Sequence, residues 1–119
     1  MESKISILHF NDVYNIEERK VDPCGGISWF VTVLERYKDL DPLVIFSGDI
    51  FSPSSLSITL RGDHMIPFLK KAKVCVACVG NHDLDFGLPW FEELSAKCEF
   101  PWLLSNILWK RDKSPIWGT

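Results

Sequence analysis

The stretch VCVACVGNHD, residues 74–83, decides the fold of this chain of 119 residues. Its first six residues are apolar and rich in valine, which is typical of a buried β-strand, and glycine and asparagine then end the run. Two other apolar runs end in a similar way, since residues 5–10 lead into a loop with Asp12 and residues 43–46 lead into a loop with Asp49. The sequence therefore predicts three strands that each run directly into a polar loop.

Helical patterns lie between these strands. From residue 27 apolar side chains recur at helical spacing as far as the breaker Asp41-Pro42, whereas residues 15–26 are polar and contain Pro23 and two glycines, as in a surface loop. The predicted elements are strands at 5–10, 43–46, 74–79 and 102–104 and helices at 27–41, 63–73 and 89–97. This alternation predicts an α/β fold with a parallel sheet. All strands of such a sheet end at one edge, where open α/β sheets bind ligands.

Composition narrows the possible classes of function. A chain with 46% hydrophobic and 24% charged residues is typical of one folded domain, and a net charge of -3 provides no basic surface for a nucleic acid polymer. No apolar run reaches the roughly 18 residues of a membrane span, and no signal peptide follows Met1, so we expect an intracellular, cytoplasmic location. The four cysteines are expected to be buried free thiols.

Three oxygen-bearing side chains follow three successive strands. Asp12, Asp49 and Asn81 are separated by about one strand-helix-strand unit each, so the crossovers would bring their oxygens together at one edge. Converging oxygen ligands suit a divalent cation such as Mn²⁺, Mg²⁺ or Zn²⁺. Each residue taken alone is better explained as an ordinary turn former, because Asp and Asn are common in turns after strands, but three such residues at matching positions favour a site.

A histidine adjoins this group of residues. His82 follows Asn81, and Asp85 is close enough in sequence to accept a hydrogen bond from its ring. A histidine oriented by a carboxylate beside a metal can donate a proton or stabilise an oxyanion. Away from a metal, the same pair would be a structural contact within a loop.

Three sequence blocks resemble a known family. Residues 7–12 (ILHFND), 47–49 (SGD) and 80–87 (GNHDLDFG) are similar to the first three signature blocks of the calcineurin-like metallophosphoesterases, in particular the 5'-nucleotidase branch. The resemblance implies the first half of an α/β/β/α sandwich. Residues 1–119 would then be an incomplete N-terminal portion of a metallophosphoesterase domain, with 109–119 as a tail and with a C-terminal half of the same polypeptide as the missing partner.

The resemblance also implies roles for individual residues. Asp12 would bind the first of two divalent cations, Asp49 would bridge both, and Asn81 would bind the second. His82, with its tautomer set by Asp85, would stabilise charge on the phosphoryl or leaving oxygen. The implied reaction is hydrolysis of a phosphomonoester, such as a 5'-nucleotide, by a metal-activated water.

Two features depart from the family pattern. Tyr14 stands where the first block normally has a histidine, and its ordinary pKa of about 10 makes ligation as a phenolate costly. We expect a weakened or altered metal site, with a water in the gap as a further alternative. The distal histidine ligands are also absent, since His9 is expected to pack or to support a ligand and His64 to lie in a surface loop. A catalytically inactive metal- or partner-binding remnant is therefore the rival hypothesis.

The remaining motifs favour structural roles. Cys75 and Cys78 have no second cysteine pair for zinc and are expected to fill the core, and Gly25-Gly26 lacks the spacing of a phosphate-binding loop. No base accompanies the serines at 52, 54 and 55. The tryptophans that we expect a missing half to cover are Trp102, Trp109 and Trp117.

Overall fold

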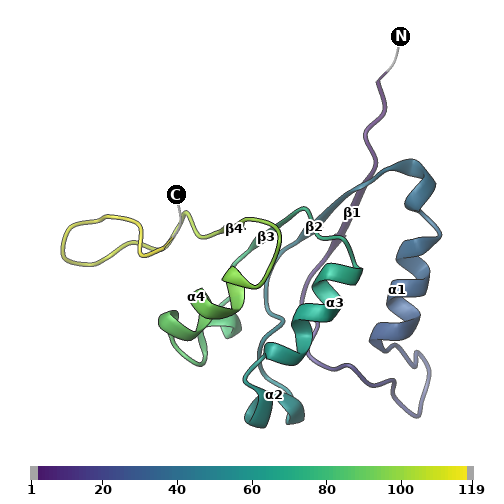
Figure 1. Cartoon of the computed structure of the whole chain (residues 1–119), viewed down its shortest axis with the longest axis horizontal. Helices are drawn as coiled ribbons and strands as arrows, with labels where there is room; N and C mark the ends of the chain where they lie inside the picture. The colour runs from purple at the N-terminus through teal and green to yellow at the C-terminus, as the bar shows by residue number, and fades with distance from the viewer. Residues whose placement is uncertain (1–2, 118–119) are drawn as a thin grey trace.

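A computed structural model describes residues 3–117 and contains one parallel sheet (Figure 1). Strands β1 (Ile7–Phe10), β2 (Leu43–Phe46), β3 (Val76–Cys78) and β4 (Trp102–Leu103) lie side by side in chain order. Every neighbouring pair is parallel, so all four strands end at the same edge. The α/β fold and the common edge predicted from the alternation are confirmed.

Helical segments connect the strands, and several are shorter than predicted. The helix predicted from residue 27 ends at Glu35 and is followed by one 3-10 turn before Asp41, which has a left-handed φ of 46°. The segment 63–73 divides into a 3-10 turn and a helix with Pro67 in its first turn. The α-helices are α1 (Ile27–Glu35), α2 (Ser55–Leu60), α3 (Ile66–Lys71) and α4 (Leu88–Ala96), and the 3-10 turns are η1 (Lys38–Leu40), η2 (Asp63–Met65) and η3 (His82–Leu84).

Helix α2 was not predicted, because its serine-rich start has the composition of a loop. The hydroxyl of Ser54 accepts a hydrogen bond from the backbone N–H of Ser57, and the hydroxyl of Ser57 accepts one from the N–H of Ser54. This reciprocal capping satisfies two donors at the start of the helix. Serine therefore starts a helix here rather than interrupting one.

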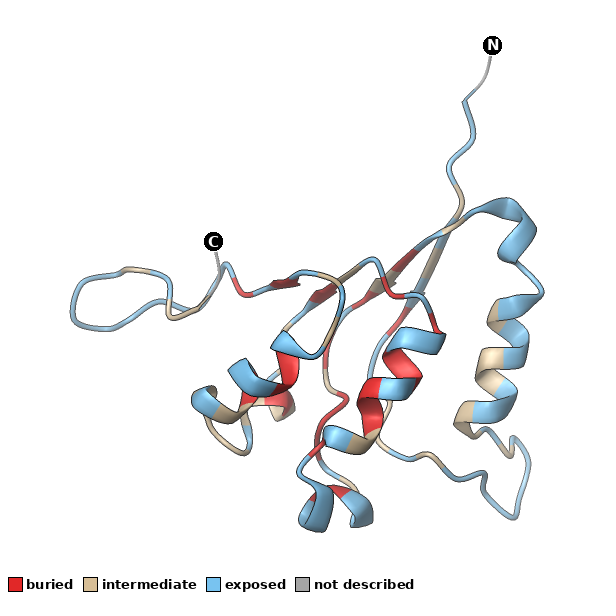
Figure 2. Ribbon diagram, viewed as in Figure 1, coloured by how far each residue is buried: buried red, intermediate tan, exposed pale blue. Residues whose placement is uncertain are grey.

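The hydrophobic core lies between one face of the sheet and helices α3 and α4 (Figure 2). Alternate strand residues point into it, and the side chain of Phe46 is fully buried. Trp102 packs its ring centroid 5.3 Å from that of Phe91 on α4. Helix α1 contributes no fully buried residue, although the ring of Phe30 lies 5.0 Å from that of Phe10.

The opposite face of the sheet is covered by none of the helices in the described part of the chain. Its residues include Ile7, Leu43 and Leu103, which are 58%, 48% and 44% exposed. Cys78 is also exposed, because its neighbour Ala77 points into the core and successive strand residues alternate between faces. The prediction that Cys75 and Cys78 fill the core is therefore wrong, since both thiols are exposed.

The three tryptophans near the C-terminus have different environments. Trp102 is only 5% exposed, and the ring of Trp117 packs 5.0 Å from that of Phe91, so the protein itself covers both. Trp109 is 43% exposed and lies in a loop closed by antiparallel pairing of Leu108 with Pro115. The predicted tail 109–119 is thus a folded loop as far as residue 117, and residues 118–119 lie outside the described part. Within residues 3–117 no helix has the length and apolarity needed to cross a bilayer.

The substitution Phe46→Ala tests the position of the core. Because Phe46 is fully buried between the sheet and the helices, its truncation is expected to lower the free energy of unfolding by about 3–5 kcal/mol. Urea denaturation followed by circular dichroism measures this loss. The control Ile58→Ala removes a side chain that is 82% exposed and is expected to change the free energy by less than about 0.5 kcal/mol. An equal loss in the free energy of unfolding for the two substitutions would contradict the position of Phe46 in the core.

Candidate functional site

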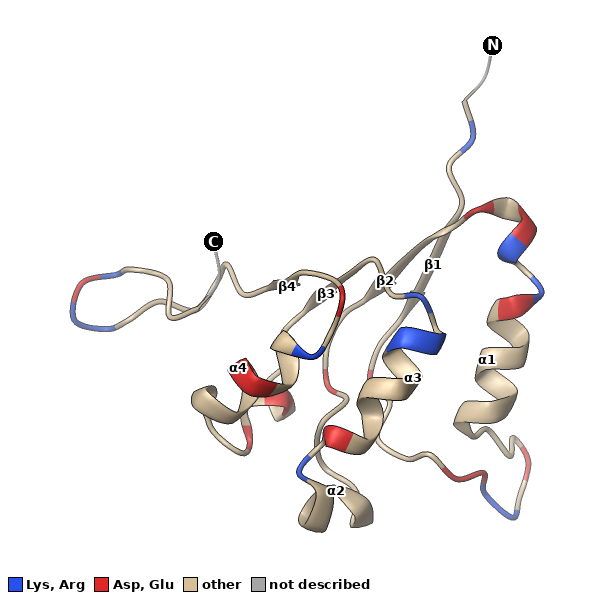
Figure 3. Cartoon of the chain, viewed as in Figure 1, with Lys and Arg blue, Asp and Glu red and all other residues tan. Residues whose placement is uncertain are grey.

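The ends of β1 and β2 position two aspartates at the common edge of the sheet. Beyond the strands the parallel pairing continues, as the N–H of Asp12 donates to the carbonyl of Gly48 at 3.1 Å and that of Val13 to Asp49 at 3.0 Å. Asp12 and Asp49 both adopt left-handed backbone conformations, with φ of 57° and 66°. This conformation is uncommon for residues other than glycine and clusters at functional sites. In Figure 3 acidic segments lie directly beyond the ends of β1 and β2.

The hydroxyl of Tyr14 lies between these two carboxylates. Its oxygen is 2.6 Å from Oδ1 of Asp12 and 3.2 Å from Oδ2 of Asp49. Because both carboxylates contact the same oxygen, they face a common point. The hydrogen bond to Asp12, together with partial burial and the charge of Asp49, raises the pKa of Tyr14 above its ordinary value. Tyr14 is therefore a neutral phenol rather than a phenolate, and its single proton points mainly to Asp12, with the longer contact to Asp49 as a second acceptor.

The other oxygen of Asp49 is held by the loop after β3. Oδ1 accepts a hydrogen bond of 2.8 Å from the backbone N–H of His82. Gly80 makes this approach possible, because a Cβ at that position would lie 2.1 Å from the same Oδ1. A Cβ on Gly48 would in turn lie 2.4 Å from the backbone nitrogen of Gly80. The two loops thus pack against each other at two glycines.

The buried side chain of Asp83 cross-links the same two loops by hydrogen bonds. Its side chain is almost fully buried and accepts hydrogen bonds from four backbone N–H groups, at distances of 2.8 to 3.1 Å. Three donors follow β2, on Asp49, Ile50 and Phe51, and the fourth, on Gly80, follows β3. Burial raises the pKa of Asp83, and the four N–H groups act in the opposite direction. Since every partner is a donor, the arrangement requires two acceptor oxygens.

His82 stands beside the two aspartates and is oriented by Asp85. Its Nδ1 lies 3.0 Å from Oδ2 of Asp85, and its ring centroid lies 6.1 Å from that of Tyr14. The hydrogen bond to Asp85 raises the pKa of His82, and the same bond lowers the pKa of Asp85. A carboxylate accepts hydrogen bonds, so Nδ1 carries a proton and Nε2 is left for another partner.

The other predicted residues lie at different distances from this group. Asn81 is exposed and directly precedes His82, whose backbone contacts Asp49. His9 is exposed, and its Nε2 on β1 lies 2.7 Å from the hydroxyl of Ser47, the residue that follows β2. His64 lies in η2 rather than in a surface loop, and burial lowers its pKa. The structure therefore brings together Asp12, Tyr14, Asp49, His82 and Asp85, with Asn81 adjoining them.

Comparison with known families assigns the chain. The family model for calcineurin-like phosphoesterases matches residues 5–118. The chain belongs to the calcineurin-like phosphoesterase family. No curated protein sequence matches the chain at a significant level.

Three solved structures resemble the chain in fold. A 5'-nucleotidase precursor from Thermus thermophilus has a TM-score of 0.75 and 22% identity over 86% of the chain. The NAD nucleotidase of Haemophilus influenzae has a TM-score of 0.74 and 22% identity over 92%. A putative 5'-nucleotidase from Staphylococcus aureus has a TM-score of 0.68 and 17% identity over 89%. The chain spans only 22%, 24% and 23% of the length of these three proteins.

The donor set of this chain can be compared with the coordination that a divalent metal ion requires. Among residues 3–117 no three His, Cys, Asp or Glu side chains form a metal-binding group. The predicted ligands are instead two carboxylates, a phenol and an amide, which are oxygen donors of the kind that Mg²⁺ and Mn²⁺ prefer. The point shared by Asp12 and Asp49 is taken by the hydroxyl of Tyr14. The set fits a divalent cation if this hydroxyl moves aside or loses its proton.

Sequence reasoning assigned no role to Asp83 or Gly80, although both lie within the block that carries the family resemblance. The only sequence signal for Asp83 is an acidic residue between a strand end and the apolar Leu84. Its buried position and its four N–H partners depend on how the loops after β2 and β3 meet. The local sequence around Asp83 does not show how these two loops pack together.

The substitution Asp83→Asn tests this support of the site. It replaces one acceptor oxygen by an NH₂ group that would face two backbone N–H donors, and buried unpaired donors are costly. We expect the free energy of unfolding to fall by about 3 kcal/mol in urea denaturation. The control Asp39→Asn changes an exposed side chain and is expected to have an effect below about 0.5 kcal/mol. A fully stable Asp83→Asn protein would exclude the supporting role.

Proposed function

We propose that this chain forms the N-terminal part of the catalytic domain of a metal-dependent phosphoesterase. The observation that carries the proposal is the contact of two strand-end carboxylates with one phenol oxygen, beside a histidine oriented by Asp85. Membership of the calcineurin-like phosphoesterase family supports the same chemistry. The residues proposed to bind metal are Asp12, Tyr14, Asp49 and Asn81, and the proposed catalytic pair is His82 and Asp85.

The metal ligands are proposed from the oxygens that face the shared point. Asp12 would hold one ion through Oδ1, and Asp49 would serve both ions through Oδ2, because its Oδ1 already accepts a hydrogen bond from the N–H of His82. Asn81 would supply an amide oxygen for the second ion. When bound, two divalent cations such as Zn²⁺, Mn²⁺ or Mg²⁺ supply an acidified water and the positive charge that attracts a phosphate.

His82 is proposed to act on the phosphate ester itself. Asp85 holds Nδ1–H, so the ring presents Nε2 on the side away from Asp85. The charged form of the ring donates Nε2–H to a phosphoryl or leaving oxygen, where negative charge develops. Asp85 thereby acts as a positioning residue that sets the tautomer and the ring plane.

The proposed substrates are 5'-nucleotides or related phosphomonoesters. Support comes from the fold shared with a 5'-nucleotidase precursor and a NAD nucleotidase, although identities of 22% establish the fold alone. The second candidate is an inactive metal- or partner-binding remnant. It is favoured by the protonated hydroxyl of Tyr14 at the shared point and by the small number of ligands among residues 3–117.

The substitution Tyr14→His tests the metal centre. An imidazole supplies a nitrogen ligand where the structure has a phenol whose pKa is raised, so Mn²⁺ is expected to bind about tenfold more tightly. Isothermal titration calorimetry with MnCl₂ measures the affinity. The matched control is Tyr37→His, which changes an exposed tyrosine and should leave the affinity unchanged. An affinity that is insensitive to both Tyr14→His and Asp12→Asn would place the metal elsewhere.

Hydrolysis of p-nitrophenyl phosphate with Mn²⁺ tests the reaction. The chain of 119 residues is expected to hydrolyse this ester only slowly. A longer polypeptide that adds the remaining part of the proposed catalytic domain is expected to be active. In the active polypeptide His82→Ala is expected to lower kcat by about 10²–10⁴-fold, because it removes the proposed proton donor. The control His64→Gln changes a histidine in η2 and should retain kcat within about twofold. Normal Mn²⁺ binding without hydrolysis in either polypeptide would favour the remnant.

A further inference from the structure

A pocket of about 370 Å³ lies between helices α1 and α3, at the edge of the sheet where the strands begin. Leu8 on β1 and Val44 on β2 line it from the sheet, and Leu34 and Ala72 line it from the helices. In Figure 1 the ends of α1 and α3 and the start of β1 lie at the same end of the molecule, opposite to α2. The volume is within the range of about 300–1,000 Å³ that is typical of small-molecule sites.

We propose that this pocket binds an organic anion with an apolar body, such as a medium-chain carboxylate. The apolar body would lie against the sheet and the two helices, and the negative head group would lie at the lysines around the opening. The proposal goes beyond the proposed function, since none of the six proposed site residues lines this pocket. It requires neither a metal ion nor a phosphate ester.

The inner lining of the pocket is apolar. Val44 and Ala72 are buried, and Leu8 and Leu34 are partly buried and pack against the core. Leu8 and Val44 are also direct partners in the parallel pairing of β1 and β2, so they form one continuous apolar surface. Such a surface favours the hydrocarbon part of a ligand, because binding removes apolar area from water on both sides.

Lysines surround the opening of the pocket. All four are exposed, unlike the apolar lining, and two carboxylates, of Glu35 and Asp41, accompany them. Figure 3 shows part of this group as the blue segment at the end of α3. The four lysines are Lys38, Lys70, Lys71 and Lys73. Since the whole chain has a net charge of -3, they concentrate positive charge on an acidic protein, and this attracts an anion.

Two of the four lysines have a structural explanation. Nζ of Lys70 and Nζ of Lys71 lie 3.0 Å and 3.1 Å from glutamate oxygens, and both residues belong to the last turn of α3, where positive charge stabilises a helix. Lys38 and Lys73 form no ion pair with a side chain among residues 3–117. Their ammonium groups are therefore free to contact a ligand.

The backbone at Lys73 has a conformation that does not require a lysine. Lys73 has a left-handed φ of 55°, its N–H donates to the carbonyl of Lys70 at 3.0 Å, and the N–H of Val74 donates to that of Leu69 at 3.4 Å. These two bonds form the helix ending in which glycine usually occupies the left-handed position. Glycine would form the same turn with less strain, so the charge of Lys73 can be removed without loss of the turn.

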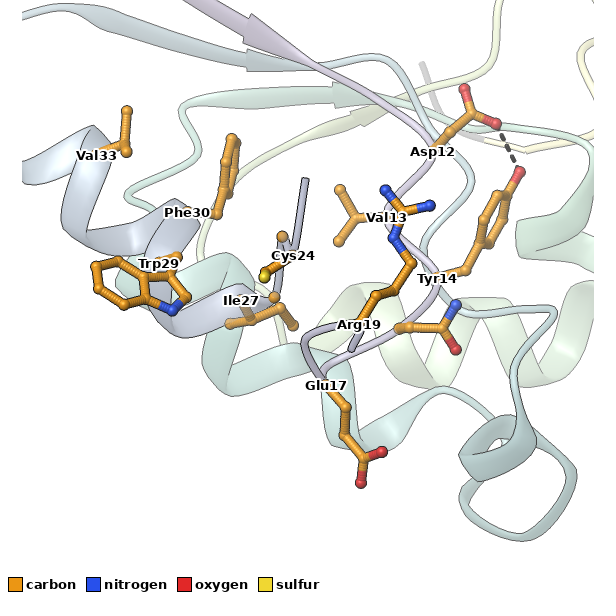
Figure 4. Close-up of a pocket in the computed structure, with 13 residues that line it drawn as sticks. Asp12, Val13, Tyr14, Glu17, Arg19, Cys24, Ile27, Trp29, Phe30 and Val33 are labelled. Carbon is orange, nitrogen blue, oxygen red and sulfur yellow. Dashed lines mark hydrogen bonds between the residues drawn. The ribbon is translucent and has the colours of Figure 1, made fainter. Parts of the chain in front are cut away.

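The larger pocket near the start of α1, shown in Figure 4, has a different lining. Arg19 is the one cation among the described residues that line it, and its guanidinium already donates to the carbonyl of Pro23 at 3.0 Å. In Figure 4 the carboxylate of Asp12 and the hydroxyl of Tyr14 are directed away from the other lining residues. The pocket between α1 and α3 is therefore the better site for an anion.

Octanoate provides a probe with an apolar chain and a single carboxylate. In ¹H–¹⁵N correlation spectra of the chain of 119 residues, octanoate is expected to shift the amide signals of Leu34, Val44 and Ala72 saturably. Acetate keeps only the head group and should leave these signals unchanged at the same concentrations. The uncharged 1-octanol has a chain of the same length and should bind about tenfold more weakly, because it does not interact with the charges of the lysines.

Substitutions of either sign of charge test the head-group position. Lys73→Gly removes one ammonium group and keeps the turn, so it is expected to weaken octanoate binding about threefold, and the double variant with Lys38→Gln about tenfold. The matched control is Lys113→Gly, which replaces an exposed lysine with a φ of 60° in the C-terminal loop and should leave the affinity unchanged. Asp41→Asn removes a negative charge at a left-handed position that asparagine tolerates, and it should tighten binding about twofold or more.

Three results would overturn the pocket assignment. They are a lack of saturable shifts with octanoate, shifts confined to Ile7 and Leu103 on the exposed face of the sheet, and equal affinities of Lys73→Gly and Lys113→Gly. Equal binding of 1-octanol and octanoate would contradict the anionic head group. Because this titration needs neither metal nor hydrolysis, loss of Mn²⁺ binding with an intact octanoate response contradicts the proposed function alone. Manganese-dependent hydrolysis without an octanoate response contradicts the pocket alone.

Discussion

The carboxylate of Asp83 holds together the two loops on which the candidate centre is built. Its two oxygens accept four backbone N–H groups, three after β2 and one after β3. This interaction fixes the distance between the loops, and the contact of Gly80 with Asp49 depends on that distance. This interaction also positions Asp49 and His82. The backbone N–H of Asp49 donates to Asp83, and the backbone N–H of His82 donates to the carboxylate of Asp49.

The second constraint is electrostatic. Asp12 and Asp49 face a common point, and two carboxylates so close to each other repel unless positive charge or a proton donor lies between them. In this chain the hydroxyl of Tyr14 fills that place, and the raised pKa of Tyr14 is the consequence. The same phenol connects the two hypotheses for function, since in a phosphoesterase a cation must take the place of its proton or of the whole hydroxyl, and in an inactive remnant neither change is needed.

The loop after β1 connects the candidate centre with the surfaces around it. Asp12 and Tyr14 belong to the candidate centre and also line a pocket beside α1. Asn15 lines both this pocket and a second pocket beside α2. The loop follows a sheet that is packed on one face only in the described part of the chain. Helices cover its core-facing side, and its other side exposes Ile7, Leu43 and Leu103.

The sequence alone determined the order of the elements and the edge of the sheet at which the site lies. Alternating apolar runs and helical patterns predict a parallel sheet. Asp12, Asp49 and Asn81 could be placed at its edge because each follows a strand, and His82 and Asp85 because they follow Asn81 in the same loop. The element bounds, helix α2 and the exposure of Cys78 were missed, since capping and the choice of strand face depend on packing. Only the tertiary structure decided that the hydroxyl of Tyr14 contacts two aspartates and that Asp83 is buried and accepts hydrogen bonds from four backbone N–H groups. These contacts are between residues that are distant in sequence, and the local conformational preferences of each residue do not determine how closely such residues approach in the folded chain.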